Sequence, residues 1–299
     1  MEKNGKFYVQ IPQEGLPRKV PMPLTKRDPN NTQHFVIIGG GPAGLNCAET
    51  LRQSGYSGQV TIISDEQMIP YDRTLLSKAL AVGDPSKWTL RDQNFLSEAD
   101  IDCRIKSPVF NINTDEKKVI LRNGKKIFYD KLCIATGSHV WKPPVPGLDL
   151  PGVYPLRTEK DQGKIKEACA SAKNIVIIGA SFIGSECAAS LKMHFKDAVN
   201  IDVINGEETP FALQLGTEIG AFYQKEHEEN GVKVHNSVLI KSANKGDDGK
   251  VKSVTLSDGR EMPADVVILG TGVRPNTKFL SKSGIEMNSD GGIVCDPFM

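Results

Sequence analysis

The sequence alternates between short runs of β-branched apolar residues and longer segments in which apolar and polar positions recur at helical spacing. The first such run, at residues 35–38, enters a glycine turn and an amphipathic segment, and a second run follows at residues 60–63. Short apolar runs bounded by turn residues are typical of buried strands, and helical spacing is typical of a surface helix. We therefore predict a βαβ unit over residues 35–66.

The turn of this unit carries Gly39, Gly41 and Gly44 in the spacing G-x-G-x-x-G. In a dinucleotide site such glycines turn the chain tightly, let the backbone approach a pyrophosphate and pack the helix on the strand. The anion is bound by free N–H groups at the helix start, and an acid some twenty residues on binds the ribose hydroxyls. Asp65 and Glu66 both lie at that distance. The alternative is an ordinary α/β domain with turn glycines.

Residues 174–204 repeat the pattern of the first unit, with a second glycine turn at residues 179–184. Its middle position is Ser181 instead of glycine, and Asn205 stands at the acid position. Asparagine hydrogen-bonds a ribose hydroxyl without contributing charge. The repeat is therefore either a second dinucleotide site or a doubled fold that no longer binds a second nucleotide.

The rest of the sequence predicts a linker and further strands and helices, which together indicate a two-domain α/β chain. The five prolines at positions 12–29 predict an extended linker before residue 34, with one strand at residues 6–11. Pro70 and Asp72 favour a turn into a helix that carries Arg73 and Lys78, cations that either lie on a solvated face or bind a pyrophosphate and an electron-rich ring. Further predicted elements are strands at residues 101–104, 109–112, 118–121, 125–129, 131–137, 232–240, 250–256 and 264–269, and a helix at 217–230.

Charge and composition narrow the function classes. Lys and Arg total 37 against 36 for Asp and Glu, so no net field attracts nucleic acid or an anionic membrane. No apolar run approaches the length of a membrane span, and no signal-peptide core is seen, so we expect a mitochondrial or cytoplasmic protein. The six cysteines and five histidines are scattered without metal-ligand spacing. No two cysteines are close in the sequence, so we predict no metal site and no dithiol–disulfide relay beside a cofactor, and we expect the cysteines to act as small buried apolar residues.

Several short motifs together resemble the pyridine nucleotide-disulfide oxidoreductase superfamily, the two-dinucleotide flavoproteins of the glutathione-reductase class. Within it they are similar to ferredoxin reductases and, most closely, to apoptosis-inducing-factor-like reductases that carry a Rieske domain. The resemblance covers nearly all of residues 35–299. It rests on residues 47–53 (CAETLRQ), 70–73 (PYDR), 76–78 (LSK), 135–137 (ATG), 182–184 (FIG) with Glu186, 207–211 (EETPF) and 270–276 (GTGVRPN).

The resemblance implies two Rossmann-like domains with FAD in the first and NAD(P)H, weakly NADH, in the second. Lys78, near the flavin, and Glu186, near the nicotinamide, are the implied catalytic residues. Residues 1–34 are then a linker, 35–146 the first part of the FAD-binding domain, 147–270 the NAD(P)-binding domain and 271–299 a return to the first. The implied cofactor contacts are Gly39, Gly40, Gly41, Pro42, Ala43, Gly44, Asp65, Glu66, Arg73, Lys78, Val109, Ala135, Thr136, Gly137, Arg157, Gly179, Ala180, Ser181, Phe182, Ile183, Gly184, Glu186, Asn205 and Gly272.

The implied activity is hydride transfer from NAD(P)H to FAD and then single-electron transfer to an iron–sulfur protein of the Rieske or ferredoxin type. Family members continue past the equivalent of Met299 into the rest of the FAD domain and a C-terminal interface domain, and a Rieske domain would lie upstream. We therefore expect a chain truncated at both ends, whose FAD site a homo-oligomer or a partner chain completes. The alternative is a non-catalytic reductase-derived subunit or fragment that has lost full flavin binding.

Overall fold

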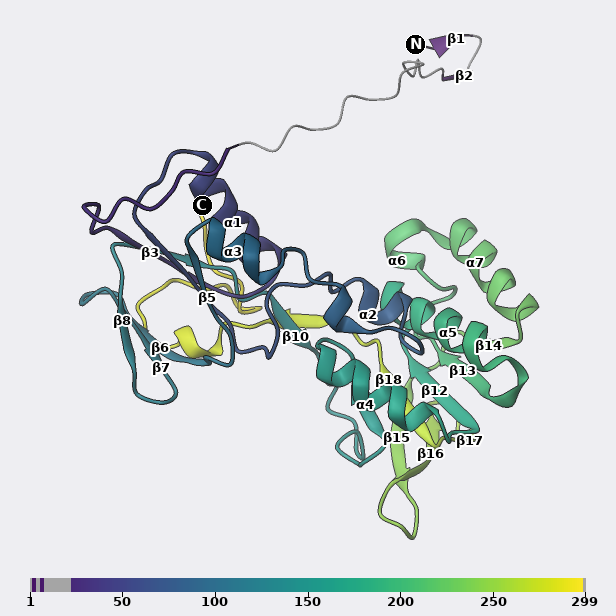
Figure 1. Ribbon diagram of the computed structural model, residues 1–299. Coiled ribbons are helices and arrows are strands. Elements are labelled where there is room, and N and C mark those ends of the chain that lie inside the picture. Colours follow the sequence, from purple (N-terminus) through teal and green to yellow (C-terminus); the bar gives the residue numbers. More distant parts are fainter. Residues whose placement is uncertain (1, 4–5, 8–22, 298–299) are drawn as a thin grey trace.

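The computed structural model describes residues 2–3, 6–7 and 23–297, and Figure 1 shows them arranged around two separate parallel sheets. Near the start, β1 (Glu2–Lys3) and β2 (Lys6–Phe7) pair antiparallel. The rest of the strand predicted at residues 6–11, and most of the predicted linker, lie outside the described residues. No helix in the described part of the chain is both long and apolar enough to cross a membrane.

The first sheet has the order β5-β4-β3-β9, with all strands parallel. Helix α1 covers one face, where Leu45 and Ala48 pack on Ile37 and Ile62. An antiparallel sheet of β6, β7 and β8 covers the other face. The bounds are β3 (His34–Ile38), α1 (Pro42–Gln53), β4 (Gln59–Ile63), α2 (Leu75–Lys78), η1 (Pro85–Lys87), α3 (Gln93–Glu98), β5 (Ile101–Arg104), β6 (Val109–Asn113), β7 (Lys118–Leu121), β8 (Lys126–Phe128) and β9 (Lys131–Ile134).

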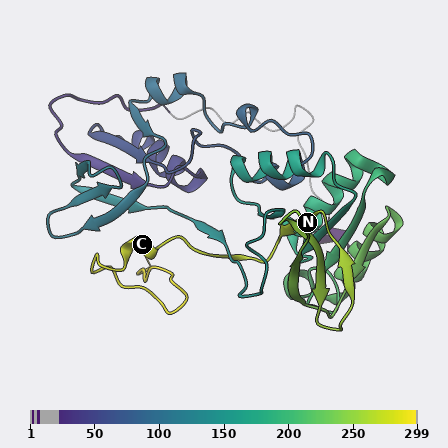
Figure 2. The same cartoon turned by 90° about the horizontal axis from the view of Figure 1, so that it is seen from below.

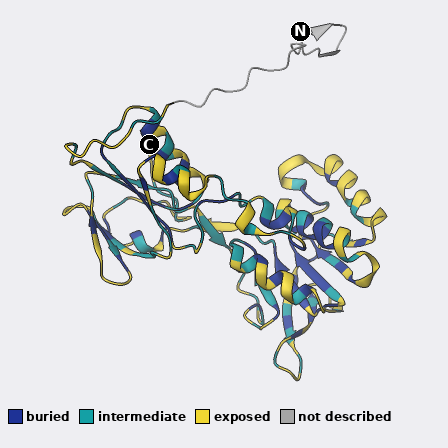
Figure 3. Cartoon of the chain, in the orientation of Figure 1, coloured by how far each residue is buried: buried dark blue, intermediate teal, exposed yellow. Residues whose placement is uncertain are grey.

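The second sheet repeats this plan with the parallel order β11-β18-β12-β13-β14. Helices α4 and α5 cover one face, the meander β15-β16-β17 covers the other, and the strands between them are buried (Figure 3). The bounds are β11 (Val153–Pro155), α4 (Glu159–Cys169), β12 (Asn174–Ile178), α5 (Phe182–Phe195), η2 (Lys196–Ala198), β13 (Asn200–Ile204), α6 (Ala212–Leu215), α7 (Thr217–Glu229), β14 (Val232–His235), β15 (Ile240–Lys245), β16 (Val251–Leu256), β17 (Glu261–Pro263) and β18 (Val266–Leu269).

The two units are joined by a short antiparallel ladder of β10 (Ser138–Val140) and β19 (Val273–Pro275). After β19 the chain returns to the first unit, where Leu280 of η3 (Lys278–Leu280) joins the core between the parallel sheet and β6–β8 (Figure 2). The predicted α/β fold with two Rossmann-like units is confirmed. The exact domain bounds at residues 34, 146 and 270 stay a proposal.

One predicted strand is wrong. Residues 232–240 were expected to be continuous, but β14 ends at His235 and β15 begins at Ile240. Ser237 between them has a φ of 55°, a left-handed conformation that a strand does not accommodate. Val232 and Ile240 therefore belong to two different sheets and Val238 lies in the loop between them, although the spacing of these residues along the sequence fits one strand.

Candidate functional site

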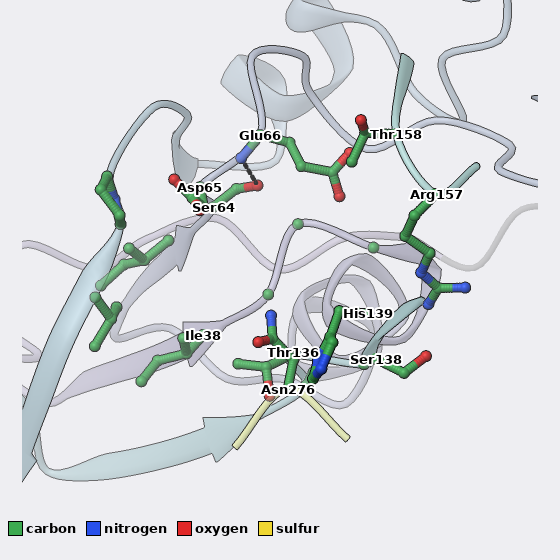
Figure 4. Close-up of a pocket in the computed structure, with 18 of the residues that line it drawn as sticks. Ile38, Ser64, Asp65, Glu66, Thr136, Ser138, His139, Arg157, Thr158 and Asn276 are labelled. Carbon is green, nitrogen blue, oxygen red and sulfur yellow. Dashed lines mark hydrogen bonds between the residues drawn. The ribbon is translucent and has the colours of Figure 1, made fainter. Parts of the chain in front are cut away.

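A cavity of about 890 Å³ lies where β3, β4 and β9 end in the first unit. Ligands of open α/β sheets bind outside the carboxyl ends of the strands, so this is the expected place for a cofactor. Figure 4 shows its walls, with Ser64, Asp65 and Glu66 on one side and Thr136, His139 and Asn276 on another. The predicted residues that line it are Gly39, Gly40, Gly41, Pro42, Ala43, Asp65, Glu66, Arg73, Val109, Ala135, Thr136, Gly137 and Arg157.

The three motif glycines differ in what surrounds them. A Cβ at Gly44 would stand 2.0 Å from the carbonyl oxygen of Gly39, and a Cβ at Gly39 would stand 2.0 Å from that of Ala135. These two glycines let α1 and the end of β9 pack closely against the turn. Gly44 has this packing role alone, because it does not line the cavity. Gly41 would meet nothing within 4 Å. The open space beside Gly41 faces the cavity and suits a close ligand.

The two candidate acids have different surroundings. Glu66 forms an ion pair with Arg73 and accepts a hydrogen bond of 2.6 Å from the Tyr71 hydroxyl. Arg73 also donates to the carbonyl oxygen of Arg157 at 2.5 Å. Burial and the hydrogen bond to Glu66 raise the pKa of Tyr71. The hydroxyl therefore stays protonated and donates a hydrogen bond to the carboxylate. Asp65 is exposed and lines the cavity, and is therefore the acid that is open to a ribose.

Other lining residues were not predicted as site residues. Arg122 follows β7, His139 lies on β10, and Lys278 lies on η3, all distant in sequence from the glycine turn. Asn276 also lines the cavity. It is the last residue of the motif at residues 270–276, which the sequence made recognisable, but it was not predicted to be a site residue. The further lining residues are Ile38, Ile63, Ser64, Ser107, Pro108, Ser138, Val140, Pro155, Thr158, Asp161 and Phe279.

Lys78 and Glu186 are brought together, but outside this cavity. Lys78 Nζ lies 3.0 Å from Glu186 Oε1, and the buried Ser77 hydroxyl donates to Glu186 Oε2 at 2.5 Å. Helix α2, whose Leu76 lies in the core of the second unit, thus contacts the first turns of α5. Lys78 is exposed and does not line the cavity, so its predicted place beside a flavin remains a prediction.

The second glycine turn has the same close packing as the first. A Cβ at Gly184 would stand 1.8 Å from the Gly179 carbonyl oxygen, and a Cβ at Gly179 would stand 2.3 Å from that of Gly270. Ser181, the N-cap of α5, has φ −85° and ψ −165°, close to the φ −91° and ψ −177° of Gly41. That backbone is open to any residue, so serine keeps the turn intact.

The residues predicted to contact the second nucleotide differ in how exposed they are. Ala180 is buried, Ile183 is half-buried, and Phe182 is exposed with its ring 5.1 Å from that of Phe211. The buried Asn205 amide donates to Glu207 O at 3.1 Å and to the Asn236 side chain at 2.9 Å. Asn205 thereby holds its own loop in place. These hydrogen bonds would compete with a hydrogen bond from the same amide to a ribose hydroxyl.

A second cavity, of about 960 Å³, lies between α5 and α7. Phe182 and Glu186 line it, but the other residues of the second glycine turn, Asn205 and Gly272 do not. This cavity runs along α5 and does not lie at the carboxyl ends of the strands. Only two of the predicted contacts to the second nucleotide therefore lie at this cavity.

The prediction for the cysteines needs a correction. Cys169 and Cys187 are buried as expected, but Cys47, Cys103 and Cys133 are half-buried and Cys295 is exposed. Cys47, Cys103 and Cys133 all pack against the apolar core beneath α1. Among the described residues, no three metal-ligating side chains lie together.

Comparison with known proteins places these features in a family. The sequence model described as "Pyridine nucleotide-disulphide oxidoreductase" matches residues 33–299. The chain is 36% identical to rhodocoxin reductase of Rhodococcus erythropolis over 89% of this chain and 61% of that protein. It is 35% identical to apoptosis-inducing factor 3 of Homo sapiens over 90% of this chain and 44% of that protein.

Solved structures agree with this likeness. The ferredoxin reductase of the CYP199A2 system from Rhodopseudomonas palustris superposes with a TM-score of 0.81 at 32% identity, over 86% of this chain and 63% of that one. A covalent putidaredoxin reductase–putidaredoxin complex gives a TM-score of 0.80 at 30% identity, over 87% and 63% of the two chains. The chain spans 44% to 61% of the length of the two curated relatives named above.

Proposed function

Because the chain belongs to the pyridine nucleotide-disulphide oxidoreductase family, we propose that it works as an NAD(P)H-dependent flavoprotein reductase that passes single electrons to an iron–sulfur protein. Family membership confirms the predicted class of FAD-dependent oxidoreductases with NAD(P)H as second cofactor. The activity of the whole protein, its acceptor and its site residues are parts of the proposal.

The observation that carries the proposal is the cavity at the strand ends of the first unit. Its glycine turn leaves open space beside Gly41, where a Cβ would otherwise stand, and the N-terminus of α1 faces that space. Free N–H groups there suit a pyrophosphate, and the exposed Asp65 suits ribose hydroxyls. These residues fit FAD, which would be held by the turn at residues 39–43, by Asp65 and by Arg157 on the opposite wall.

Bound FAD supplies the chemistry of accepting a hydride from NAD(P)H and releasing electrons one at a time. The residues of the chain set the position in which this happens. Lys78 and Ser77 on α2 each hold one carboxylate oxygen of Glu186, which fixes the start of α5 beside the turn at residues 179–184. That turn would hold the second nucleotide, and hydride transfer depends steeply on how the reacting groups are positioned.

The change Glu186→Gln is expected to slow the reductive half-reaction about tenfold while FAD content stays the same. The amide keeps the bond from Ser77 but loses the ion pair with Lys78, so α5 is held less firmly. Stopped-flow bleaching of flavin absorbance by NADH measures the effect. The matched control is Glu229→Gln, which removes an exposed ion pair with Lys225 on α7. Equal rates for the two variants would remove Glu186 from the mechanism.

The acceptor class is proposed from the relatives. One of them is the ferredoxin–NAD(+) reductase subunit of a benzene dioxygenase system, and the putidaredoxin reductase structure contains putidaredoxin. An iron–sulfur protein of the ferredoxin or Rieske type is therefore the proposed partner. The proposal also includes a preference for NADH, a mitochondrial or cytoplasmic location, and assembly with a second copy or a partner chain.

A second candidate function is a reductase-derived binding subunit without turnover. Asn205 supports it, because the amide of this side chain is already bonded to Glu207 O and to the Asn236 side chain. The first experiment separates the two functions: an absorbance spectrum of the chain incubated with FAD, before and after anaerobic NADH or NADPH. A flavin spectrum that bleaches supports the reductase. Bound flavin that never bleaches supports the binding subunit, and a protein that FAD cannot reconstitute contradicts the FAD site.

A further inference from the structure

Glu66, Tyr71 and Arg73 form a hydrogen-bonded cluster at the wall of the cofactor cavity. Arg73 binds both carboxylate oxygens of Glu66, Nη2 at Oε1 and Nη1 at Oε2, the second at 3.3 Å. The Tyr71 hydroxyl donates to Glu66 Oε2 at 2.6 Å and accepts from Arg73 Nη1 at 3.0 Å. Tyr71 is buried, and the side chains of Arg73 and Glu66 are only 19% and 22% exposed. Each of the three polar groups therefore finds partners inside the cluster.

The cluster reaches the main chain of Arg157, which follows β11 in the second unit. Arg73 Nη1 donates to the Arg157 carbonyl oxygen at 2.5 Å. The Arg157 N–H donates to Asp161 Oδ2 at 3.0 Å, in the first turn of α4. Both backbone polar groups of Arg157 are thus held, one by the cluster and one by α4. Because the allowed rotamers depend on the backbone angles, this limits the directions in which the Arg157 side chain points.

The Arg157 guanidinium is the part of this arrangement that remains open to a ligand. It lines the cavity across from Asp65 (Figure 4). Burial, together with the nearby cation of Arg73, lowers the pKa of Arg157. Among the residues that the structure describes, no carboxylate forms an ion pair with this guanidinium. An anion in the cavity would therefore give this partly buried charge a partner.

The guanidinium also lies close to the first glycine turn. Arg157 Nη2 lies 3.4 Å from the place where a Cβ of Gly137 would stand. The turn packs on the two residues before Gly137, since a Cβ at Gly39 would stand 2.0 Å from Ala135 O and 3.1 Å from Thr136 N. An anion on the N–H groups at the start of α1 would therefore share this part of the cavity with the guanidinium. Arginine binds phosphate oxygens through paired N–H bonds, which suits a pyrophosphate.

We propose that Glu66, Tyr71 and Arg73 are positioning residues, which hold the Arg157 guanidinium toward the pyrophosphate of the bound cofactor. The inference rests on the proposed function and adds the means by which one anion-binding group of the site is aimed. Glu66 and Tyr71 fix the guanidinium of Arg73, and Arg73 fixes the carbonyl group of Arg157. Arg73 and Glu66 thus act on the cofactor through Arg157, in place of the direct contacts that the sequence predicts.

The test is a double-mutant cycle on the affinity of the full chain for FAD, measured by titration of flavin fluorescence. Arg157→Met removes the guanidinium and is expected to weaken FAD binding about tenfold. Glu66→Gln keeps the shape of the side chain but removes the charge that holds Arg73, and is expected to weaken binding about fivefold. In the Arg157→Met background, Glu66→Gln should cause no further loss, because the effects of residues that act through one another are not additive.

Arg73→Lys reaches the same result by a second route. A lysine keeps the positive charge but lacks the planar fork that spans Glu66 and the Arg157 carbonyl group. The loss of affinity should match that of Glu66→Gln and should again vanish beside Arg157→Met. The matched control is Glu49→Gln, which breaks a half-buried ion pair of 3.0 Å with Arg91 away from the cavity and should leave the affinity unchanged. Circular dichroism checks the fold of each variant.

ADP separates this inference from the reductase function, because it carries a pyrophosphate without a flavin. Calorimetric titration with ADP should show the same cycle, even where NADH never bleaches bound FAD. Unchanged affinity in Arg157→Met would overturn the inference, as would equal effects of Glu66→Gln with and without Arg157→Met. Tighter binding in Glu66→Gln would also overturn it, because Glu66 would then only repel the anion. A chain that binds neither FAD nor ADP contradicts the FAD site and the inference together.

Discussion

Replacement of Arg52 by methionine is expected to lower the free energy of unfolding by about 3–5 kcal/mol. Arg52 on α1 has no exposed surface. Its Nε donates to Ala99 O at 2.8 Å, Nη1 donates to Tyr56 O at 2.7 Å and Gly58 O at 2.8 Å, and Nη2 donates to Asp100 O at 2.8 Å. Methionine fills part of the same volume but has no donor. Buried carbonyl groups are then left without partners, and each costs about 1–3 kcal/mol.

The effect is large because these four bonds join three segments of the first unit. They connect the C-terminal end of α1 with the start of β4 and with the turn between α3 and β5. Urea unfolding followed by circular dichroism measures the change as a shift of the midpoint at constant slope. Arg27→Met is the control, because the Arg27 side chain lies at the surface. A loss at Arg52 as small as at Arg27 would contradict the structural role.

The strands and glycine turns were predictable because their causes are local. The strand expected at residues 174–178 is β12 (Asn174–Ile178), and those expected at 35–38 and 60–63 begin one residue earlier, as β3 and β4. Buried parallel strands consist of apolar residues on both faces, so neighbours in sequence carry the whole signal. The close packing at Gly44 and Gly184 follows from the spacing of the motif in the same way.

The remaining site features depend on which strands become neighbours, and the local pattern does not contain that information. His139 and Lys278 reach the cavity because β10 pairs with β19 and η3 returns to the first unit. The environment of Asn205 depends on Asn236, beyond the helix α7. In each case residue type suggested a role, but only the tertiary arrangement decides it.

Gly41→Ser is expected to weaken FAD binding about a hundredfold, or about 3 kcal/mol, while the fold stays intact. The change copies into the first turn the residue that the second turn carries at Ser181, where the backbone angles are nearly the same. The fold therefore tolerates it. The new side chain would occupy the open space beside the turn and keep a pyrophosphate away from the N–H groups at the start of α1.

Flavin fluorescence titration measures the affinity, and circular dichroism checks the fold. The matched control is Gly163→Ser on α4, where a Cβ also meets nothing within 4 Å but no cavity is adjacent. Unchanged affinity at Gly41 would mean that the pyrophosphate does not approach this turn. A hundredfold loss at Gly41 with none at Gly163 would identify the first glycine turn as the FAD contact, and would imply that Ser181 makes the second turn the weaker nucleotide site of the two.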